Sequence, residues 1–247
     1  MERQGRPRGE AVKAGLPGQP LTSEGAFLHV FEVELELHGV FWFHTIAQPR
    51  EKYVHVGLPL IHNYPLTLAF LGRPVDESYA SVAYTIARSA DARVTWEQRG
   101  FYVYPASATR MYVRQVLFSM DGTGYLTVKA KTRASVPDLT SHQVFLPGSV
   151  FRTYLISRSR EPGLPQFVRL GAKRYGVFKV HYNYLGVGAP QVNADGKRAT
   201  HPFNVRECPA SSYHAVMSHH AGDVAVTGVP KRVITVRDVV LALPSFI

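Results

Sequence analysis

Apolar and polar residues alternate near the start of the chain, over residues 30–37. Phe31, Val33, Leu35 and Leu37 are apolar, and the positions between them are glutamates. Because successive side chains of a strand point to opposite faces, this period of two predicts a strand with one buried and one solvated face. The glutamates would repel phosphate groups, so a surface for a polyanion is expected elsewhere or at the strand ends.

A short buried helix is predicted where the apolar spacing changes to three and four residues. Tyr64, Leu68 and Leu71 fall on one helical face. Asn63 is a favoured N-cap residue, and Gly72 suits the C′ position just beyond the helix. The pattern therefore predicts a helix that begins after Asn63 and ends before Gly72.

Most of the remaining chain has the pattern of strands. A second helix is expected over residues 76–90, and Asp-Gly-Thr-Gly at 121–124 is typical of a hairpin turn. An excess of strands over helices favours an α+β fold, although the pattern alone does not distinguish among such folds. The further strands are predicted at residues 101–105, 111–120, 125–131, 151–157, 167–170, 177–184, 224–229 and 232–243. Residues 40–43 are a second apolar run, and a helical turn at 236–243 is the alternative for the end of the last strand.

The composition indicates one folded unit behind a polar tail. Residues 1–25 are rich in Gly, Pro and Arg and are predicted to be disordered, and residues 26–247 are predicted to form one domain. The sequence has no run of 18 apolar residues, so no membrane span is predicted. The first residues also lack the apolar stretch of a secretory signal. A single cysteine, Cys208, excludes an internal disulfide and fits a reducing cytoplasm.

Charge is distributed unevenly along the chain. Residues 1–98 contain 9 basic and 11 acidic side chains, a net charge of −2, and residues 99–247 contain 19 and 7, a net charge of +12. A strong field of one sign on part of a small protein favours a polyanionic partner such as nucleic acid. A basic surface without a specific partner is the competing interpretation.

The strongest predicted binding segment lies near residue 170. Gly171 and Gly176 allow a ligand to approach the backbone closely, the cations can neutralise phosphates, and the aromatic ring can stack on an unpaired base. An exposed basic hairpin that only aids solubility remains the alternative. Four cations and one aromatic residue fall within eleven positions: Arg169, Lys173, Arg174, Tyr175 and Lys179.

A second basic segment has cations at every other position. Lys129, Lys131 and Arg133 would line one side of a strand, because alternate residues face the same way. A phosphate track and a solvated strand face explain this spacing about equally well.

Two separate motifs resemble the type I-D Cas-five-type family, a RAMP-superfamily subunit of the CRISPR complex called Cascade. They are Ile-His-Asn-Tyr at 61–64 and the Arg-x-Gly-x-Lys-Arg pattern at 169–174. Weaker similarity occurs at Tyr-Pro-Ala, 104–106, and at Phe-Arg-Thr-Tyr, 151–154. The resemblance covers about residues 27–244 and departs at Pro65, where the family usually has a small residue.

The resemblance implies a ferredoxin-like, RRM-type core with a β-rich insertion. It also implies a non-catalytic subunit that caps the 5′ handle of the crRNA. The implied partners are a Cas-seven-type backbone subunit, a Cas-ten-type large subunit and, through the complex, target DNA. The expected RNA contacts include the residues of the two basic segments above. The other expected contacts are Arg50, Lys52, Tyr53, His62, Asn63, Tyr64 and Arg152.

Enzymatic and metal-binding alternatives have weaker support. Some RAMP relatives cleave RNA without metal, and His62 or His55 with Tyr64 and Lys52 could supply the required base, acid and cation. No spacing of these residues favours cleavage over binding, so we expect that the protein is not an enzyme. One cysteine and irregularly spaced histidines do not match a structural zinc site, and no cofactor is expected.

Overall fold

The computed structural model describes residues 27–41, 54–55, 59–72, 88–119, 139–171, 176–192, 196–218 and 224–247. The predicted tail, residues 1–25, lies outside these ranges. Neither of the helices described is long and apolar enough to cross a membrane.

The described elements are mostly strands, with two helices, so the α+β prediction is confirmed only in the coarse sense that both kinds of element occur. In chain order they are β1 (Leu28–Leu37), β2 (Val54–His55), β3 (Leu60–Ile61), α1 (Asn63–Phe70), α2 (Arg88–Arg99), β4 (Phe101–Val103), β5 (Ala106–Arg110), β6 (Val113–Ser119), β7 (Leu139–Phe145), β8 (Val150–Ser157), β9 (Phe167–Leu170), β10 (Gly176–Gly188), β11 (Pro190–Val192), β12 (Phe203–Asn204), β13 (Ala210–Ser218), β14 (Val224–Pro230), β15 (Arg232–Val236) and β16 (Val239–Ala242).

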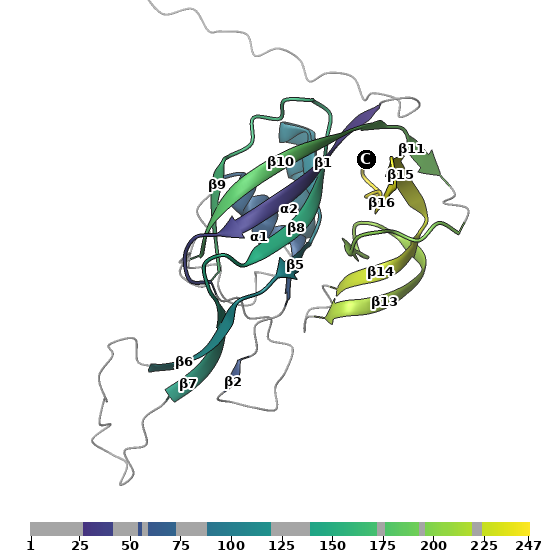
Figure 1. The fold of residues 1–247 in the computed structure, drawn as a ribbon. Coiled ribbons are helices and arrows are strands. Elements are labelled where there is room, and N and C mark those ends of the chain that lie inside the picture. The colour runs from purple at the N-terminus through teal and green to yellow at the C-terminus, as the bar shows by residue number, and fades with distance from the viewer. Residues whose placement is uncertain are drawn as a thin grey trace, which may run out of the picture.

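The main sheet has seven strands in the order β3-β5-β8-β1-β10-β9, and β4 also pairs with β8. Its neighbouring strands are antiparallel. Strand β1 lies in the middle, and its predicted alternation is confirmed, since Val33, Leu35 and Leu37 are buried while Glu34 is exposed. Both helices lie behind the sheet as seen in Figure 1.

Four of these segments follow one another across the sheet as β4/β5, β8, β1 and β10. The connection from β1 to β4 carries both helices. The connection from β8 to β10 carries strand β9, and residues 158–171, the part of it that is described, contain no helix. The β-α-β-β-α-β order expected from the resemblance is therefore met in its first half, and the second helix is not found there.

The core has two main parts. Leu66 and Phe70 of helix α1 belong to the same buried cluster as β1 residues such as Val33 and Leu35. Burying a side chain of this size stabilises the fold by about 1.5–3 kcal/mol. The second part joins Val30 of β1 to the C-terminal strands. One sheet face thus packs on the helices, and one end of the opposite face packs on the C-terminal strands.

Strands β11 to β16, called the C-terminal sheets below, form two three-stranded sheets in the orders β11-β15-β16 and β12-β14-β13 (Figure 1). They approach the main sheet closely at Gly188, where a Cβ atom would lie 2.7 Å from Cγ1 of Ile234. The helical turn considered at residues 236–243 is wrong, and the predicted closing strand at 232–243 is confirmed as two strands. That segment is the hairpin β15–β16, which turns at Arg237 with a φ of 55°.

The hairpin β6–β7 extends away from the core (Figure 1). Strand β6 pairs with β7 in antiparallel fashion, and the short β2 pairs with β7 in parallel. The predicted strand 111–120 is confirmed, and its described partner is Leu139–Phe145. The predicted hairpin turn at 121–124 and the predicted strand 125–131 lie outside the described residues. The predicted pairing of 167–170 with 177–184 is confirmed by the β9–β10 ladder.

Both helices depart from the sequence prediction at their starts. His62, not Asn63, is the N-cap of α1, and its Nδ1 atom accepts a hydrogen bond from the Tyr64 backbone at 3.4 Å. Gly72 has the expected positive φ of 65° just beyond the helix. Helix α2 runs over Arg88–Arg99, so it overlaps the predicted segment 76–90 only at its first residues.

Candidate nucleic-acid interface

The Ile-His-Asn-Tyr motif lies at the centre of a buried polar network of Asn63, Tyr102, Asn204 and Glu207. The side-chain nitrogen of Asn63 donates to Oε2 of Glu207 at 2.7 Å, and the Tyr102 hydroxyl donates to the same oxygen at 2.7 Å. The Asn204 side chain donates to Oδ1 of Asn63 at 3.3 Å. The network therefore connects helix α1 and strand β4 to strand β12 and the segment that follows it.

Burial explains why the Tyr102 hydroxyl in this network keeps its proton and acts as a donor. All four side chains are at most 2% exposed. Burial raises the pKa of the Tyr102 phenol well above its ordinary value, and the neighbouring Cys208 and Glu207 raise it further. The phenol therefore keeps the proton that it donates to Glu207.

His62, Asn63 and Tyr64 were predicted as RNA contacts, and the structure does not place them at a surface. Asn63 has none of its surface exposed, and His62 and Tyr64 are 6% and 4% exposed. The physical reason is that the motif opens helix α1, whose first turn packs against the C-terminal sheets. The structure thus gives the motif a packing role.

Among the described residues of the C-terminal part, the histidines and the cysteine are not grouped as metal ligands, and His219 and His220 lie outside the described residues. No set of three His, Cys, Asp or Glu side chains within the described ranges could hold a metal ion. His201 donates from Nε2 to the Pro105 carbonyl at 2.5 Å, and burial lowers the pKa of this histidine to about 4. Cys208 is buried, and burial raises the pKa of its thiol.

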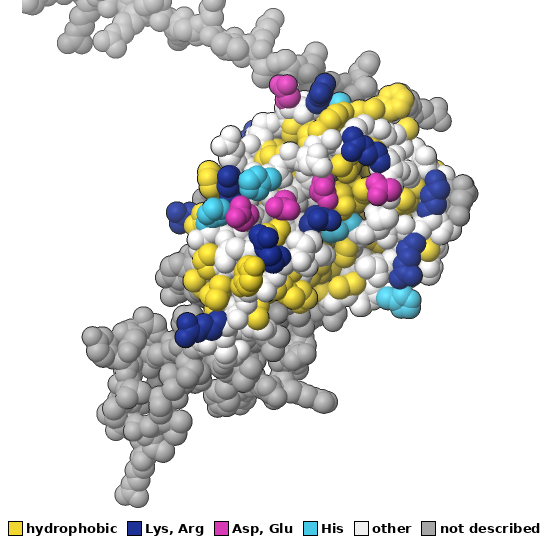
Figure 2. Space-filling model, in the orientation of Figure 1, with side chains coloured by type: hydrophobic (Ala, Val, Ile, Leu, Met, Phe, Trp, Pro, Cys, Tyr) yellow, Lys and Arg dark blue, Asp and Glu magenta, His cyan; other side chains and the backbone are white. Residues whose placement is uncertain are grey.

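The open face of the main sheet carries both charges. Arg152 of β8, a predicted RNA contact, forms an ion pair with Glu32 of β1 at 3.1 Å. Glu36 lies 3.6 Å from His38 and 3.4 Å from His181. Figure 2 shows acidic and basic side chains side by side across this face. Arg152 is exposed, but its partner offsets its charge, so the centre of this face is not a phosphate track.

The predicted basic segment at 169–179 is described at its two ends. Arg169 and Lys179 are exposed on neighbouring strands, and Phe167, which pairs with Lys179, is 57% exposed. They form an exposed edge of the sheet with two cations and one aromatic ring. The other predicted contacts lie outside the described residues: Arg50, Lys52, Tyr53, Lys129, Lys131, Arg133, Lys173, Arg174 and Tyr175.

A further exposed patch occurs where the β6–β7 hairpin leaves the core. Met111, Tyr112 and Val113 are 51%, 51% and 44% exposed, and exposed arginines stand on both sides. Figure 2 shows apolar side chains gathered at this place. We call this segment, residues 110–114, the hairpin-root patch.

Hydrogen bonds to the turn before β8 fix the backbone of this patch. Arg110 donates from Nε to the Gly148 carbonyl at 2.9 Å, and the Tyr112 backbone donates to Oγ of Ser149 at 3.0 Å. Leu146 donates to the Tyr112 carbonyl at 2.7 Å. The Tyr112 ring lies beside Gly148, where a Cβ atom would come within 3.3 Å of it. The ring is therefore held in place while half of it stays exposed.

The hairpin-root patch and the Arg169 edge lie at the same end of the main sheet. The Gly148 turn donates to the Leu37 carbonyl, and the next residue, His38, donates to the carbonyl of Val177. Val177 is in turn the register partner of Arg169. The structure thus places two predicted cations, Arg169 and Lys179, at the same end of the main sheet as a patch that the sequence reasoning missed. The missed signal was Arg-Met-Tyr-Val-Arg, an aromatic residue between two cations.

The fold defines a mostly β protein with one helical layer and a projecting hairpin, and this end of its main sheet carries exposed cations and exposed aromatic rings. The chain belongs to the type I-D CRISPR-associated Cas5/Csc1 family, whose model matches residues 28–221. This match confirms the resemblance noted from the two motifs. The chain is thus a CRISPR effector-complex subunit.

Comparisons with curated proteins and with solved structures do not extend this family assignment. A comparison with curated proteins finds no match. Among solved structures, a similar chain occurs in "Cryo-EM structure of the Type III-B Cmr-beta bound to cognate target RNA", with 12% identity and a TM-score of 0.41. The match covers 64% of this chain and 61% of that chain, and it is too distant to transfer a function.

Proposed function

We propose that this subunit binds the 5′ handle of the crRNA and caps that end of the complex. The observation that supports this most is that the hairpin-root patch lies at the same end of the main sheet as the exposed cations Arg169 and Lys179. Cations neutralise phosphates, and Tyr112 and Phe167 offer half-exposed rings on which unpaired bases can stack.

The proposed core is ferredoxin-like, with strand β9 in the place of its second helix. The order β4/β5, β8, β1, β10 with antiparallel neighbours supports this, as does the helical connection between β1 and β4. In the proposed complex the chain acts in the cytoplasm beside a Cas-seven-type backbone subunit and a Cas-ten-type large subunit, and it reaches target DNA through them.

RNA binding by the isolated protein should weaken steeply as salt increases. Four exposed cations lie at the proposed interface, namely Arg110, Arg114, Arg169 and Lys179. Releasing the counterions of four phosphates of a single strand gives a slope of log affinity against log salt of roughly −3. Filter binding with a repeat-derived RNA between low and physiological salt measures this slope. A slope near zero would contradict an electrostatic interface.

The alternative function is metal-independent cleavage of CRISPR precursor RNA. His62 and Tyr64, two of the residues considered for that chemistry, are buried, which does not favour an active site around them. We therefore expect no shortening of repeat RNA by the purified protein, with or without divalent metal, as judged by denaturing gels. Stoichiometric cleavage that disappears in a His55→Ala variant would support the alternative instead.

A further inference from the structure

Strand β13, at the outer edge of the β12-β14-β13 sheet, is unusually exposed. It pairs with β14 on one side, and no other described strand pairs with it. Six successive residues, 211–216, are exposed, including Tyr213 and Val216 at 51% each. The strand is therefore accessible on both faces as well as along its free edge.

This edge lacks the features that usually prevent a strand from pairing with another chain. Such protection comes from short length, charged side chains or proline. Strand β13 has nine residues, with no Lys, Arg, Asp, Glu or Pro among them. The other edge strands described are all shorter than β13. Three of them also carry a charge or a proline: β6 has seven residues and Arg114, β9 has four and Arg169, and β11 has three and begins with Pro190.

The geometry of the edge limits where a partner can pair. The ladder with β14 shifts register between Ala210 and Ser212 and again between Ala215 and Met217. Between these shifts, Ser212 to Ala215 pair regularly with β14. Only an extended polypeptide matches a regular row of backbone N–H and C=O groups along its whole length.

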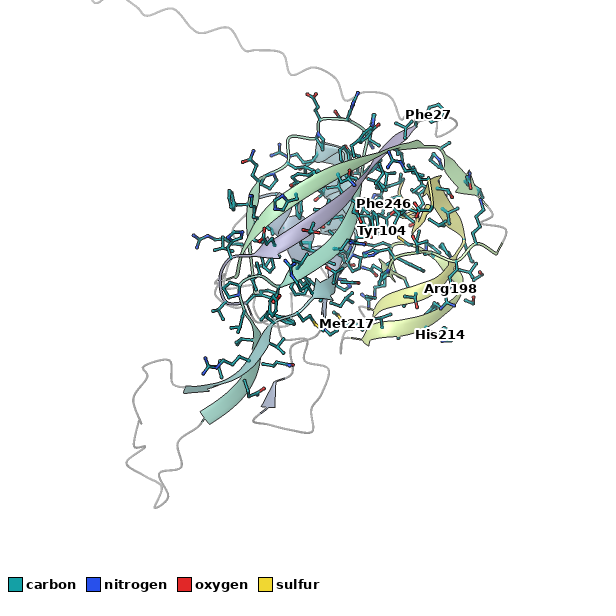
Figure 3. All side chains as sticks on the ribbon, viewed as in Figure 1. Phe27, Tyr104, Arg198, His214, Met217 and Phe246 are labelled. Atoms are coloured by element: carbon teal, nitrogen blue, oxygen red, sulfur yellow. The ribbon has the colours of Figure 1, made fainter. Side chains whose placement is uncertain are left out.

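The charge around the edge indicates the chemistry of the partner. Arg198 and His214, labelled in Figure 3, are both exposed, and Ala199, next to Arg198, donates its backbone N–H to the carbonyl of Gly228, the register partner of Tyr213. Lys231 donates its backbone N–H to the carbonyl of Pro209, just before β13. Of the acidic residues described in the C-terminal sheets, Glu207 is buried and Asp238 lies at the β15–β16 turn. A partner segment with acidic flanks complements this charge, and a basic one does not.

We propose that β13 is a docking edge to which a neighbouring protein subunit adds an extended, uncharged segment with acidic flanks. The inference rests on the chain being part of a multisubunit complex, and it assigns a protein contact to a surface separate from the proposed RNA interface. Backbone hydrogen bonds would supply the affinity, and Tyr213 and Val216 would supply contacts on either side of the added strand.

The test uses the type I-D effector complex reconstituted from all its subunits and a guide RNA. The variant Tyr213→Lys with Val216→Lys places two charges on the edge, and its incorporation into the complex should fall at least tenfold. The matched control is Val187→Lys with Val192→Lys, which converts residues that are 48% and 68% exposed and adds the same charge elsewhere. The control should incorporate normally, and both variants should keep the RNA affinity of the isolated wild-type chain.

Hydrogen exchange of the wild-type protein provides a second measurement that does not depend on how the variant folds. The amides of residues 211–216 should exchange more slowly in the complex than in the isolated chain. Normal incorporation of the edge variant with unchanged exchange would overturn the proposal. Protection by RNA alone would instead assign the edge to nucleic acid, and concentration-dependent dimerisation abolished by the edge variant would assign it to a second copy. If the isolated wild-type chain does not bind RNA, that result contradicts the proposed function and not the docking edge.

Discussion

Replacing Asn63 by alanine should lower the free energy of unfolding by about 3 kcal/mol. The change removes the donor to Glu207 and the acceptor for Asn204, both of which are buried. A buried polar group that loses its partner costs about 1–3 kcal/mol, and more when it is charged. Thermal unfolding should shift downward by roughly 8 °C, since about 1 kcal/mol corresponds to 2–4 °C for a chain of this size.

A matched control for this variant is Asn183→Ala. Asn183 is exposed, and its side chain donates to Glu32 at 3.4 Å on the open face of the sheet. Its replacement should change the unfolding free energy by less than about 0.5 kcal/mol, as is usual for surface substitutions. Equal stabilities of the two variants in urea titrations would contradict the role assigned to the buried network.

Replacing Tyr112 by alanine should weaken binding of repeat-derived RNA roughly tenfold, because stacking of a base on an aromatic ring is worth about 1–3 kcal/mol. Combining it with Arg110→Ala and Arg114→Ala should also reduce the salt slope by about 1.4, since each phosphate contact on a single strand contributes about 0.7. The hydrogen bonds that hold residue 112 to Leu146 and Ser149 come from its backbone, so the truncated side chain should leave the fold intact. Filter binding across a salt series measures both effects.

The control for the hairpin-root patch replaces one exposed aromatic residue and two exposed cations elsewhere. Phe27, Arg99 and Lys197 are exposed and belong to neither proposed interface. Their combined replacement by alanine should leave the stacking contribution unchanged and reduce the salt slope by less than the patch variant does. If both triple variants bind RNA equally, the basic charge acts without a specific site, as the competing interpretation of the sequence holds.

Local patterns were sufficient for the elements in which one face is buried and the other is solvated. The period of two over β1 reflects burial of its apolar residues on the helices, and the β9–β10 pair followed from two strand patterns around a glycine-rich turn. The start of α1 was misplaced by one residue because His62, a less favoured N-cap, takes that position once Asn63 is drawn into the network. The strand β13 was missed because its exposed residues give no alternation of apolar and polar positions.

By itself, the sequence determined the half-buried central strand, the excess of strands over helices, the uneven charge and the family, because each is written in short runs of neighbouring residues. Only the tertiary structure decided what the family motif does, because the partners of Asn63 in the network lie 39 or more residues away along the chain. The tertiary structure likewise paired Arg152 with Glu32, and it placed the hairpin-root patch at the same end of the main sheet as Arg169. These outcomes depend on which strands become neighbours, and the free energy that selects those neighbours comes from burying the whole core.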